Sequence, residues 1–299
     1  MKILFSSKDH KYTSGDKIFT SVSKLVSLYK NEFDSEYWSV YKALQRIYGD
    51  EEFKRLKGSG GDLGALIEQT DSVILNNTIE EIKQEWKDKN IKSIDKGNLY
   101  HMAKEQSAYK RGYEINPFDN KEYPIIGDFS EKEEKYSIID NLYDLQDGFY
   151  AELLMWNDQY SIAGQSDKIF IETIDGIRYA SILDYKTSKT IDTESYYDAR
   201  NQKYAMLANP LQSVMDCNFM KYSLQLSMYA FFLEKYNFVP KDLILIHLIV
   251  AETEPNKESK YKIEYEGKMF HVEHEIEYPV KYMKKEVKAL LQYHKSKLK

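Results

Sequence analysis

Cysteine is nearly missing from this chain. Its 299 residues include one cysteine, Cys217, together with only six prolines and 13 glycines. A single cysteine excludes a disulfide framework, a cysteine-based zinc site and a four-cysteine iron–sulfur cluster. The low proline and glycine content excludes collagen-like and low-complexity chains. We therefore expect a globular protein of a reducing, intracellular compartment, with no iron–sulfur cofactor.

Long hydrophobic runs are missing as well. The longest run, Leu243–Ala251, is interrupted by His247, and the N-terminal segment turns polar at Ser6. A membrane-spanning helix needs about 20 consecutive apolar residues, and a signal peptide needs a longer apolar stretch than this N-terminus offers. We therefore expect neither a signal peptide nor a membrane partner.

The charge balance and the aromatic content exclude fewer kinds of binding partner than these absences do. The chain has 48 acidic and 42 basic side chains, a formal net charge of −6, which argues against a broadly basic surface but leaves room for a local basic groove. Its 26 tyrosines are unusually many. Tyrosines stack on nucleic-acid bases, and they also fill the edges of cores, so composition alone leaves both interpretations open.

Hydrophobic spacing predicts an α/β protein: a mixed β-sheet core flanked by helices, with an N-terminal helical elaboration. We divide the chain into residues 1–95, a hairpin and helical region, and residues 96–299, the core, within one compact unit. We predict helices at Tyr37–Tyr48, Ile74–Lys87, Leu99–Glu105, Tyr222–Tyr236 and Val280–Leu298, and a flexible joint at Gly58–Gly61. We predict strands at Tyr150–Trp156, Tyr160–Glu172 (broken at Gly164), Ile177–Tyr185 and Leu243–Val250, and an edge hairpin of Lys262–Tyr265 with Phe270–Tyr278. Residues 3–19 form two short strands in this prediction, and residues 187–216 a long irregular insertion.

Two of the predicted strands carry charges where apolar residues would pack better. Asp175-Gly176 forms the turn between them, so they should pair as a hairpin. Asp184 and Lys186 are two residues apart and therefore point to the same face. Asp167 on the neighbouring strand can meet Asp184 across a metal ion, because hard divalent cations favour clustered carboxylates.

Further polar pairs lie on both sides of these strands. His101 and Glu105 are one helical turn apart, as are Gln225 and Tyr229. Glu152 places a charge inside an apolar strand. Each also has a structural interpretation: His101 as a hydrogen-bonded core histidine, and the Gln-Tyr pair as a polar helix stripe.

The order of these residues carries more information than any one of them. Gly97-x-x-x-His101, Glu105, Gly164-x-x-Asp167, Asp184-x-Lys186 and Gln225-x-x-x-Tyr229 follow one another along the chain. This order resembles the RecB-like branch of the PD-(D/E)XK nuclease superfamily, and within it the mitochondrial genome maintenance exonucleases and related bacteriophage exonucleases. The resemblance covers roughly residues 95–250. The long insertion after Lys189 departs from compact members of the group.

The resemblance implies a restriction-endonuclease-like fold and a site that binds Mg²⁺ or Mn²⁺, one ion or two. It implies Asp167, Asp184, His101 and the backbone carbonyl of Tyr185 as metal ligands. The catalytic set would be Lys186, Asp184, Asp167 and Glu152, with Lys186 orienting the attacking water. Gln225, Tyr229 and Glu105 would bind DNA or support the metal site.

We therefore expect a metal-dependent DNA exonuclease that hydrolyses single-stranded DNA, or DNA with a free end, in phage-type replication, recombination or repair. If it is phage-encoded, it would act in the cytoplasm of a bacterial host. One alternative is a structure-specific endonuclease on the same fold. The other is a DNA-binding recombination module without catalysis.

Overall fold

The computed structural model describes residues 2–31, 33–58, 63–116, 119–127, 134–139, 141–198, 201–253, 262–265 and 268–297. The chain forms two compact units, one of Met1–Asn31 with Gly97–Lys299 and the other of Glu32–Lys96. All the site residues predicted from the sequence belong to the first unit.

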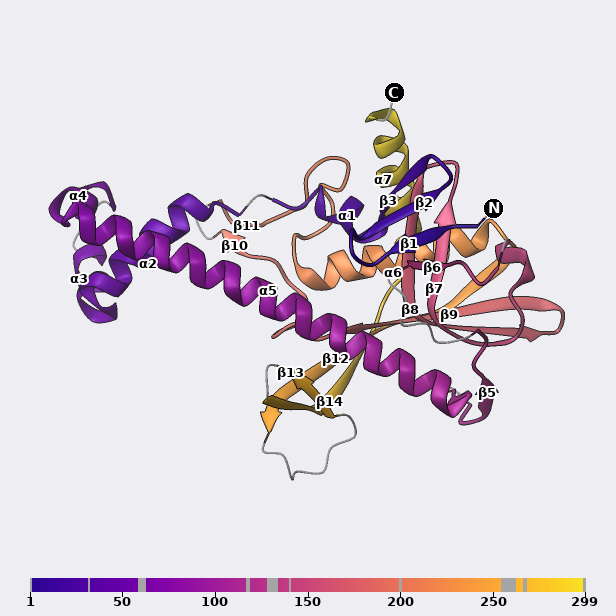
Figure 1. Ribbon diagram of the computed structural model, residues 1–299. Helices are drawn as coiled ribbons and strands as arrows, with labels where there is room; N and C mark the ends of the chain where they lie inside the picture. Colours follow the sequence, from indigo (N-terminus) through magenta and orange to yellow (C-terminus); the bar gives the residue numbers. More distant parts are fainter. Residues whose placement is uncertain are drawn as a thin grey trace. The chain divides into compact units, whose positions relative to one another are not determined.

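The first unit is a mixed α/β structure built on a ten-stranded sheet (Figure 1). The strand order is β13-β14-β12-β9-β8-β3-β2-β1-β6, with β7 paired to β8 outside this path. The strands of this sheet are β1 (Leu4–Ser6), β2 (Lys11–Ser14), β3 (Lys17–Ser21), β6 (Glu134–Tyr136), β7 (Gly148–Asn157), β8 (Ile162–Ile174), β9 (Ile177–Lys186), β12 (Phe238–Thr253), β13 (Lys262–Tyr265) and β14 (Lys268–Pro279). Two small two-stranded sheets pair β4 (Tyr113–Ile115) with β5 (Glu122–Pro124), and β10 (Tyr197–Asp198) with β11 (Lys203–Tyr204).

Helices cover both faces of this sheet. The larger core cluster joins the sheet to α1 (Val22–Ser27), α6 (Asn218–Glu234) and α7 (Lys284–Lys297). A smaller cluster joins the opposite face to residues 99–103 of α5 (Ser72–Arg111). Strand β9 contributes to both clusters, because Ile182 faces the first and Leu183 faces the second. A short 3₁₀ helix, Leu142–Asp144, precedes β7.

The second unit is helical. It contains α2 (Ser35–Tyr48), α3 (Asp50–Gly58), α4 (Leu63–Gln69) and the N-terminal part of α5. Ala43, Leu44 and Phe53 lie at the centre of its separate core. The joint predicted at Gly58–Gly61 falls mostly outside the described residues.

Helix α5 corrects one prediction from the sequence. Two separate helices were expected, Ile74–Lys87 and a short one at Leu99–Glu105 after Gly97, but one helix, α5, runs unbroken through both and through Gly97 (Figure 1). A glycine inside a helix costs only about 1 kcal/mol relative to alanine, so it does not end a helix by itself. His101 therefore lies deep within a long helix and not near the start of a short one.

Two other predictions needed changes and one was confirmed. Residues 3–19 form three strands in place of two, and these strands belong to the large sheet although the sequence analysis grouped them with the helical region. Strand β8 is not broken at Gly164. The hairpin of β8 with β9 across Asp175-Gly176 is confirmed, and these two strands pair antiparallel from Ile174–Ile177 to Lys168–Leu183.

None of the helices within the described residues is both long enough and apolar enough to cross a lipid bilayer.

Candidate metal and catalytic site

The site lies beside a stretch of β8 where the pairing with neighbouring strands is interrupted along one edge. Strand β7 pairs along one edge of β8, so β3 and β9 share the other edge. The β3 ladder ends at Ala163 and the β9 ladder begins at Lys168, so residues 164–167 of this edge have no strand partner among the described residues. The predicted Gly164-x-x-Asp167 motif occupies this gap. Backbone groups in such a gap need partners other than a strand, and side chains supply them here.

Asp167 closes one side of the gap. Continuing the register of β8 and β9 would pair Asp167 with Asp184, but the described ladder stops one pair earlier. The backbone N–H of Tyr185 instead donates to Oδ2 of Asp167 at 2.6 Å. This bond fixes the Asp167 carboxylate between the two strands, and its other oxygen faces the helix α5.

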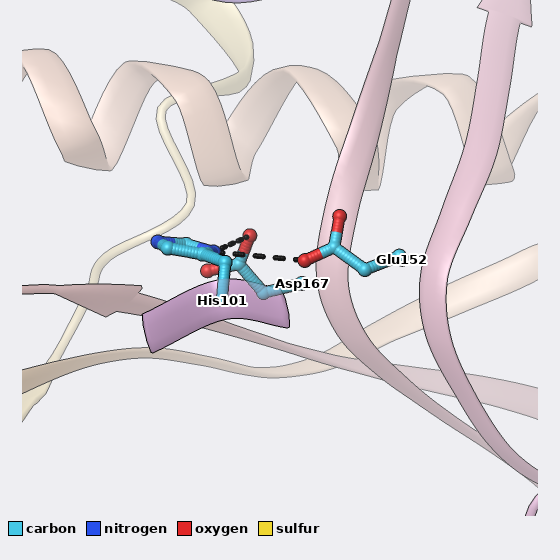
Figure 2. Close-up of side chains that lie close together, drawn as sticks. All are labelled: His101, Glu152 and Asp167. Atoms are coloured by element: carbon cyan, nitrogen blue, oxygen red, sulfur yellow. Dashed lines mark ion pairs between the residues drawn. The ribbon is translucent and has the colours of Figure 1, made fainter. Parts of the chain in front are cut away.

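The Asp167 carboxylate meets two side chains from other elements, those of His101 and Glu152 (Figure 2). Nδ1 of His101, on α5, lies 3.2 Å from Oδ1 of Asp167 and 3.6 Å from Oε1 of Glu152, on β7. The ligand atoms of the three residues all lie within 4.8 Å of one another. The chain therefore gathers one imidazole and two carboxylates from segments that are far apart in sequence.

The charges of this cluster support each other. Burial alone would lower the pKa of His101, but the Asp167 and Glu152 carboxylates outweigh it and raise that pKa well above its ordinary value. Burial opposes ionisation of Asp167 too, yet His101, Lys186 and the Tyr185 N–H together lower its pKa. The two carboxylates thus form a negative pocket that holds a positive charge on the imidazole.

Glu152 reaches this cluster from an unusual backbone conformation. Its φ is +52°, in the left-handed region that is uncommon for residues other than glycine. The residues on either side, Ala151 and Leu153, keep the regular pairing with β8. The Gln165 side chain donates to the Glu152 carbonyl at 3.1 Å, which satisfies a backbone group that the distortion frees. Strain of this kind is concentrated at functional sites.

Asp184 and Lys186 form a second charged pair beside the cluster. The Lys186 ammonium is in direct ion-pair contact with Oδ2 of Asp184, and Gln225 of α6 donates to Oδ1 at 3.3 Å. Burial raises the pKa of Asp184 to about 6, with Lys186 opposing this shift and Asp167 adding to it. Burial would lower the pKa of Lys186, but the carboxylates of Asp184 and Asp167 raise it. Lys186 is therefore held as an ammonium ion.

Tyr229 covers the remaining part of the gap. Its hydroxyl donates to the carbonyl of Gln165 at 2.7 Å, in the stretch of β8 that has no strand partner on this edge. A Cβ on Gly164 would lie 2.7 Å from this hydroxyl oxygen. Only glycine allows the ring of Tyr229 to approach β8 so closely, which explains why Gly164 and Tyr229 occur together.

Glu105 joins the site to a larger pocket. Lys135 of β6 binds both carboxylate oxygens of Glu105, at 2.9 and 2.8 Å. Burial raises the pKa of Glu105, although Lys135 opposes the shift. Glu105 and Glu152 line both a small cavity of about 40 Å³, which also contacts His101 and Asp167, and a pocket of about 440 Å³. The charged cluster thus lies beside a space large enough for part of a ligand.

The structure brings the predicted site residues together to different degrees. His101, Glu152 and Asp167 form one group, and Asp184, Lys186 and Gln225 form the adjoining network. Within the described residues, the group with metal-ligand spacing does not include Asp184, whose oxygens are engaged by Lys186 and Gln225. Asp184 and the Tyr185 carbonyl as metal ligands stay predictions. Tyr229 contacts the β8 backbone and Glu105 contacts Lys135, so both have structural partners here.

Three neighbouring residues were missed from the sequence. The Lys186 ammonium lies 5.1 Å from the ring centre of Tyr222, which is three residues before Gln225 on α6. Lys135 binds Glu105, but it lies in a polar segment without a motif. His247 pairs with Lys186 in the β9–β12 ladder, and its Nε2 donates to the Ser188 carbonyl at 2.7 Å. The interruption of the apolar run Leu243–Ala251 by this buried histidine was the available signal.

The donor set of the cluster fits a divalent cation. Ligand atoms on one octahedral ion, at about 2.1 Å from it, lie about 3–4 Å apart, close to the spacing of these three residues. Carboxylate oxygens suit Mg²⁺ and Mn²⁺, and imidazole favours transition metals. A field that stabilises a protonated imidazole also stabilises a metal ion placed between the same carboxylates.

Comparison of the sequence with known protein families and with characterised proteins finds no match.

Proposed function

We propose that this protein is a metal-dependent DNA exonuclease of the PD-(D/E)XK superfamily, RecB-like branch, with a restriction-endonuclease-like core. One observation carries the proposal. His101, Glu152 and Asp167, on α5, β7 and β8, form one cluster with metal-ligand spacing. Asp184 and Lys186 of β9 and Gln225 of α6 form the adjoining network beside the gap on the edge of β8. Unrelated surface charges would have no reason to converge where a β-ladder ends.

The proposed role of each site residue follows from its position. His101 and Asp167 would hold Mg²⁺ or Mn²⁺, with Glu152 as a further ligand or as the partner of a second ion. Asp184 and the Tyr185 carbonyl would complete the binding site, as the resemblance implies. Such an ion, when bound, neutralises charge on the phosphate and lowers the pKa of water.

The remaining side chains act on charge and orientation. Lys186, kept as an ammonium ion by two carboxylates, would stabilise the negative charge that develops on the phosphate. Gln225 would hold the Asp184 carboxylate, and Tyr229 would hold the β8 backbone next to Asp167. The primary role of these two residues would therefore be to position the carboxylates, and contact with DNA would be secondary.

Two other functions remain as outcomes of the test. A structure-specific endonuclease on the same fold would cut strands that have no end. A non-catalytic DNA-binding module would bind DNA in EDTA and leave it intact. The intact set of charged motif residues favours catalysis over binding alone.

The test uses linear single-stranded DNA labelled at either end, and a closed single-stranded circle. Each is incubated with the full chain in Mg²⁺, Mn²⁺ or EDTA. We expect loss of the linear strand only, in the presence of a metal, and the label that is released first gives the polarity of cleavage.

Lys186→Ala should abolish this loss, because it removes the ammonium at the gap. Lys189→Ala is the matched control, since Lys189 is an exposed lysine three residues further along the same chain segment. Cutting of the circle would move the assignment to an endonuclease. Binding without cleavage in both metals would overturn the catalytic proposal.

A further inference from the structure

A pocket adjoins the metal cluster on the side of Glu152, and neither the motifs nor the proposed chemistry account for it. It has a volume of about 440 Å³. Its walls come from α5, the segment before β6, β6 with the residues that follow it, and β7. We call it the Glu152 pocket, and its lining residues are Glu105, Tyr109, Gly127, Glu134, Lys135, Tyr136, Ile138, Ala151, Glu152, Leu153 and Leu154.

The Glu152 pocket shares lining residues with the cavity at the candidate site. Glu105, Ala151 and Glu152 line it and also line the small cavity that contacts His101 and Asp167. A ligand in the pocket would therefore lie directly beside the cluster. For a nuclease, this is the place of a nucleotide unit that adjoins the scissile phosphate.

The size and walls of the pocket suit a flat ring. Its volume falls within the ordinary range of small-ligand sites, about 300–1,000 Å³. Tyr136 and Ile138 are 59% and 47% exposed in the described part of the chain, and they give the pocket an apolar rim. A Cβ on Gly127 would lie 3.1 Å from the Tyr109 hydroxyl and 3.4 Å from Ile138. A glycine at this position therefore leaves room for both side chains in the pocket wall.

The charge of the pocket selects against phosphate. Among the described lining residues there are three carboxylates, those of Glu105, Glu134 and Glu152, and one ammonium, that of Lys135. Lys135 is already bound to both oxygens of Glu105. A phosphate would be repelled, whereas a neutral ring that carries N–H donors would find carboxylate acceptors.

We propose that the Glu152 pocket receives the nucleobase of the nucleotide next to the scissile phosphate, with Tyr136 as its stacking partner. The proposal rests on the proposed nuclease function and deepens it. It makes the substrate a strand whose base is unpaired and turned out of the stack at the moment of cleavage. A paired base in a duplex would not enter the pocket without first being flipped out.

The test is a set of labelled single strands in which one abasic residue is moved along the sequence. Degradation of each strand is followed at single-nucleotide resolution with the full chain and Mn²⁺. Base–aromatic stacking is worth enough to change a rate about ten-fold. We expect one step, at a fixed distance from the abasic residue, to slow by about that factor, and the slow step to move with the abasic residue.

Two variants separate the pocket from general effects. Tyr136→Ala should slow the unmodified strand and remove most of the difference between normal and abasic positions. Tyr196→Ala is the matched control, because Tyr196 is an exposed tyrosine outside the pocket and should leave the abasic pause unchanged.

The two levels of the proposal fail differently. Degradation of all strands at an even rate past the abasic residue, or an abasic pause that Tyr136→Ala leaves intact, would overturn the base pocket and leave the nuclease assignment standing. No degradation of the unmodified strand would overturn the nuclease function, and the pocket assignment with it.

Discussion

The two ends of the β8–β9 hairpin are built from the same two strands and differ in almost everything else. From Ile174–Ile177 to Lys168–Leu183 the ladder is continuous, and its inward side chains, such as Ile171 and Ile182, are fully buried. Beyond Lys168 the described ladder ends, and the Asp167 carboxylate and the Tyr229 hydroxyl bond to backbone groups there. The Lys186 ammonium pairs with the Asp184 carboxylate beside them. We call these the paired end and the open end.

The comparison shows how one hairpin can serve stability and chemistry at once. The paired end satisfies its backbone groups internally, so its side chains are free to be apolar. The open end keeps buried charges close together, which costs stability because burial disfavours ionisation. Changes at the open end should therefore reduce activity, and changes at the paired end should reduce the free energy of unfolding.

The largest expected effect comes from Asp167→Asn at the open end. Asparagine keeps the shape but removes the charge that faces His101 and the proposed metal. We expect single-strand degradation to fall about 100- to 1,000-fold, the usual cost of one such electrostatic group. Asp175→Asn, at the exposed turn of the paired end, should leave the rate unchanged. Equal rates for Asp167→Asn and the wild type would break the distinction between the two ends.

Ile171→Ala tests the paired end. Ile171 is fully buried in the larger core, so its truncation leaves a cavity. We expect the free energy of unfolding to fall by about 2–4 kcal/mol, measured by urea denaturation, with the turnover of the folded protein retained. Ile177→Ala, at a position 46% exposed, is the control and should cost much less. Loss of turnover in a folded Ile171→Ala protein would contradict the separation of roles.

Gly164→Ala tests the close contact between Gly164 and Tyr229 in the gap. The new methyl group would press on the Tyr229 hydroxyl, and we expect a loss of about 1–3 kcal/mol in the free energy of unfolding. Tyr229→Phe alone should cost about 1 kcal/mol through its lost hydrogen bond to Gln165. The double variant should lose somewhat less than the sum, because phenylalanine removes the nearest clashing atom, the hydroxyl oxygen, while Cε1 of the ring at 2.9 Å remains. Additive losses in a thermodynamic cycle would show that the two residues do not act on each other.

The smallest effect is a pH dependence at Glu105. Burial raises the pKa of Glu105 above its ordinary value of 4.5, so the folded state binds this proton more tightly than the unfolded state. Its contribution to stability is therefore present at low pH and is lost as the pH rises through the raised pKa. As the pH rises from 4 to 7, the melting temperature of Glu105→Gln should rise relative to that of the wild type, although the ion pair between Glu105 and Lys135 is lost. Melting curves that differ by a constant amount over this range would contradict the assignment.

The sequence predicted the residues of the open end better than the backbone that holds them. Alternation and the Asp175-Gly176 turn were sufficient to predict the β8–β9 hairpin, and the spacing of Asp184 and Lys186 placed both on one face. The prediction of two separate helices at Ile74–Lys87 and Leu99–Glu105 was wrong, because the glycine at position 97 does not end a helix whose flanking residues favour one.

Other features of the site depend on tertiary contacts that no local pattern encodes. The break predicted in the strand at Gly164 was wrong, since that glycine accommodates the Tyr229 ring 65 residues away in sequence and does not end a strand. The left-handed backbone of Glu152 and the pairing of Glu105 with Lys135 likewise arise only when distant segments meet. The Glu152 pocket could not be predicted because its walls come from segments of α5, β6 and β7 that are far apart in the sequence.

The central claim is that the open end is a divalent-metal site, and direct binding tests it without any substrate. Mn²⁺ would be titrated calorimetrically into the wild-type chain and into Asp167→Asn, with Asp175→Asn as the control. We predict saturable binding to the wild type and the control, and loss of that binding in Asp167→Asn, while all three proteins keep the same far-ultraviolet circular dichroism. Equal binding by all three proteins, or no binding to the wild type, would contradict the assignment.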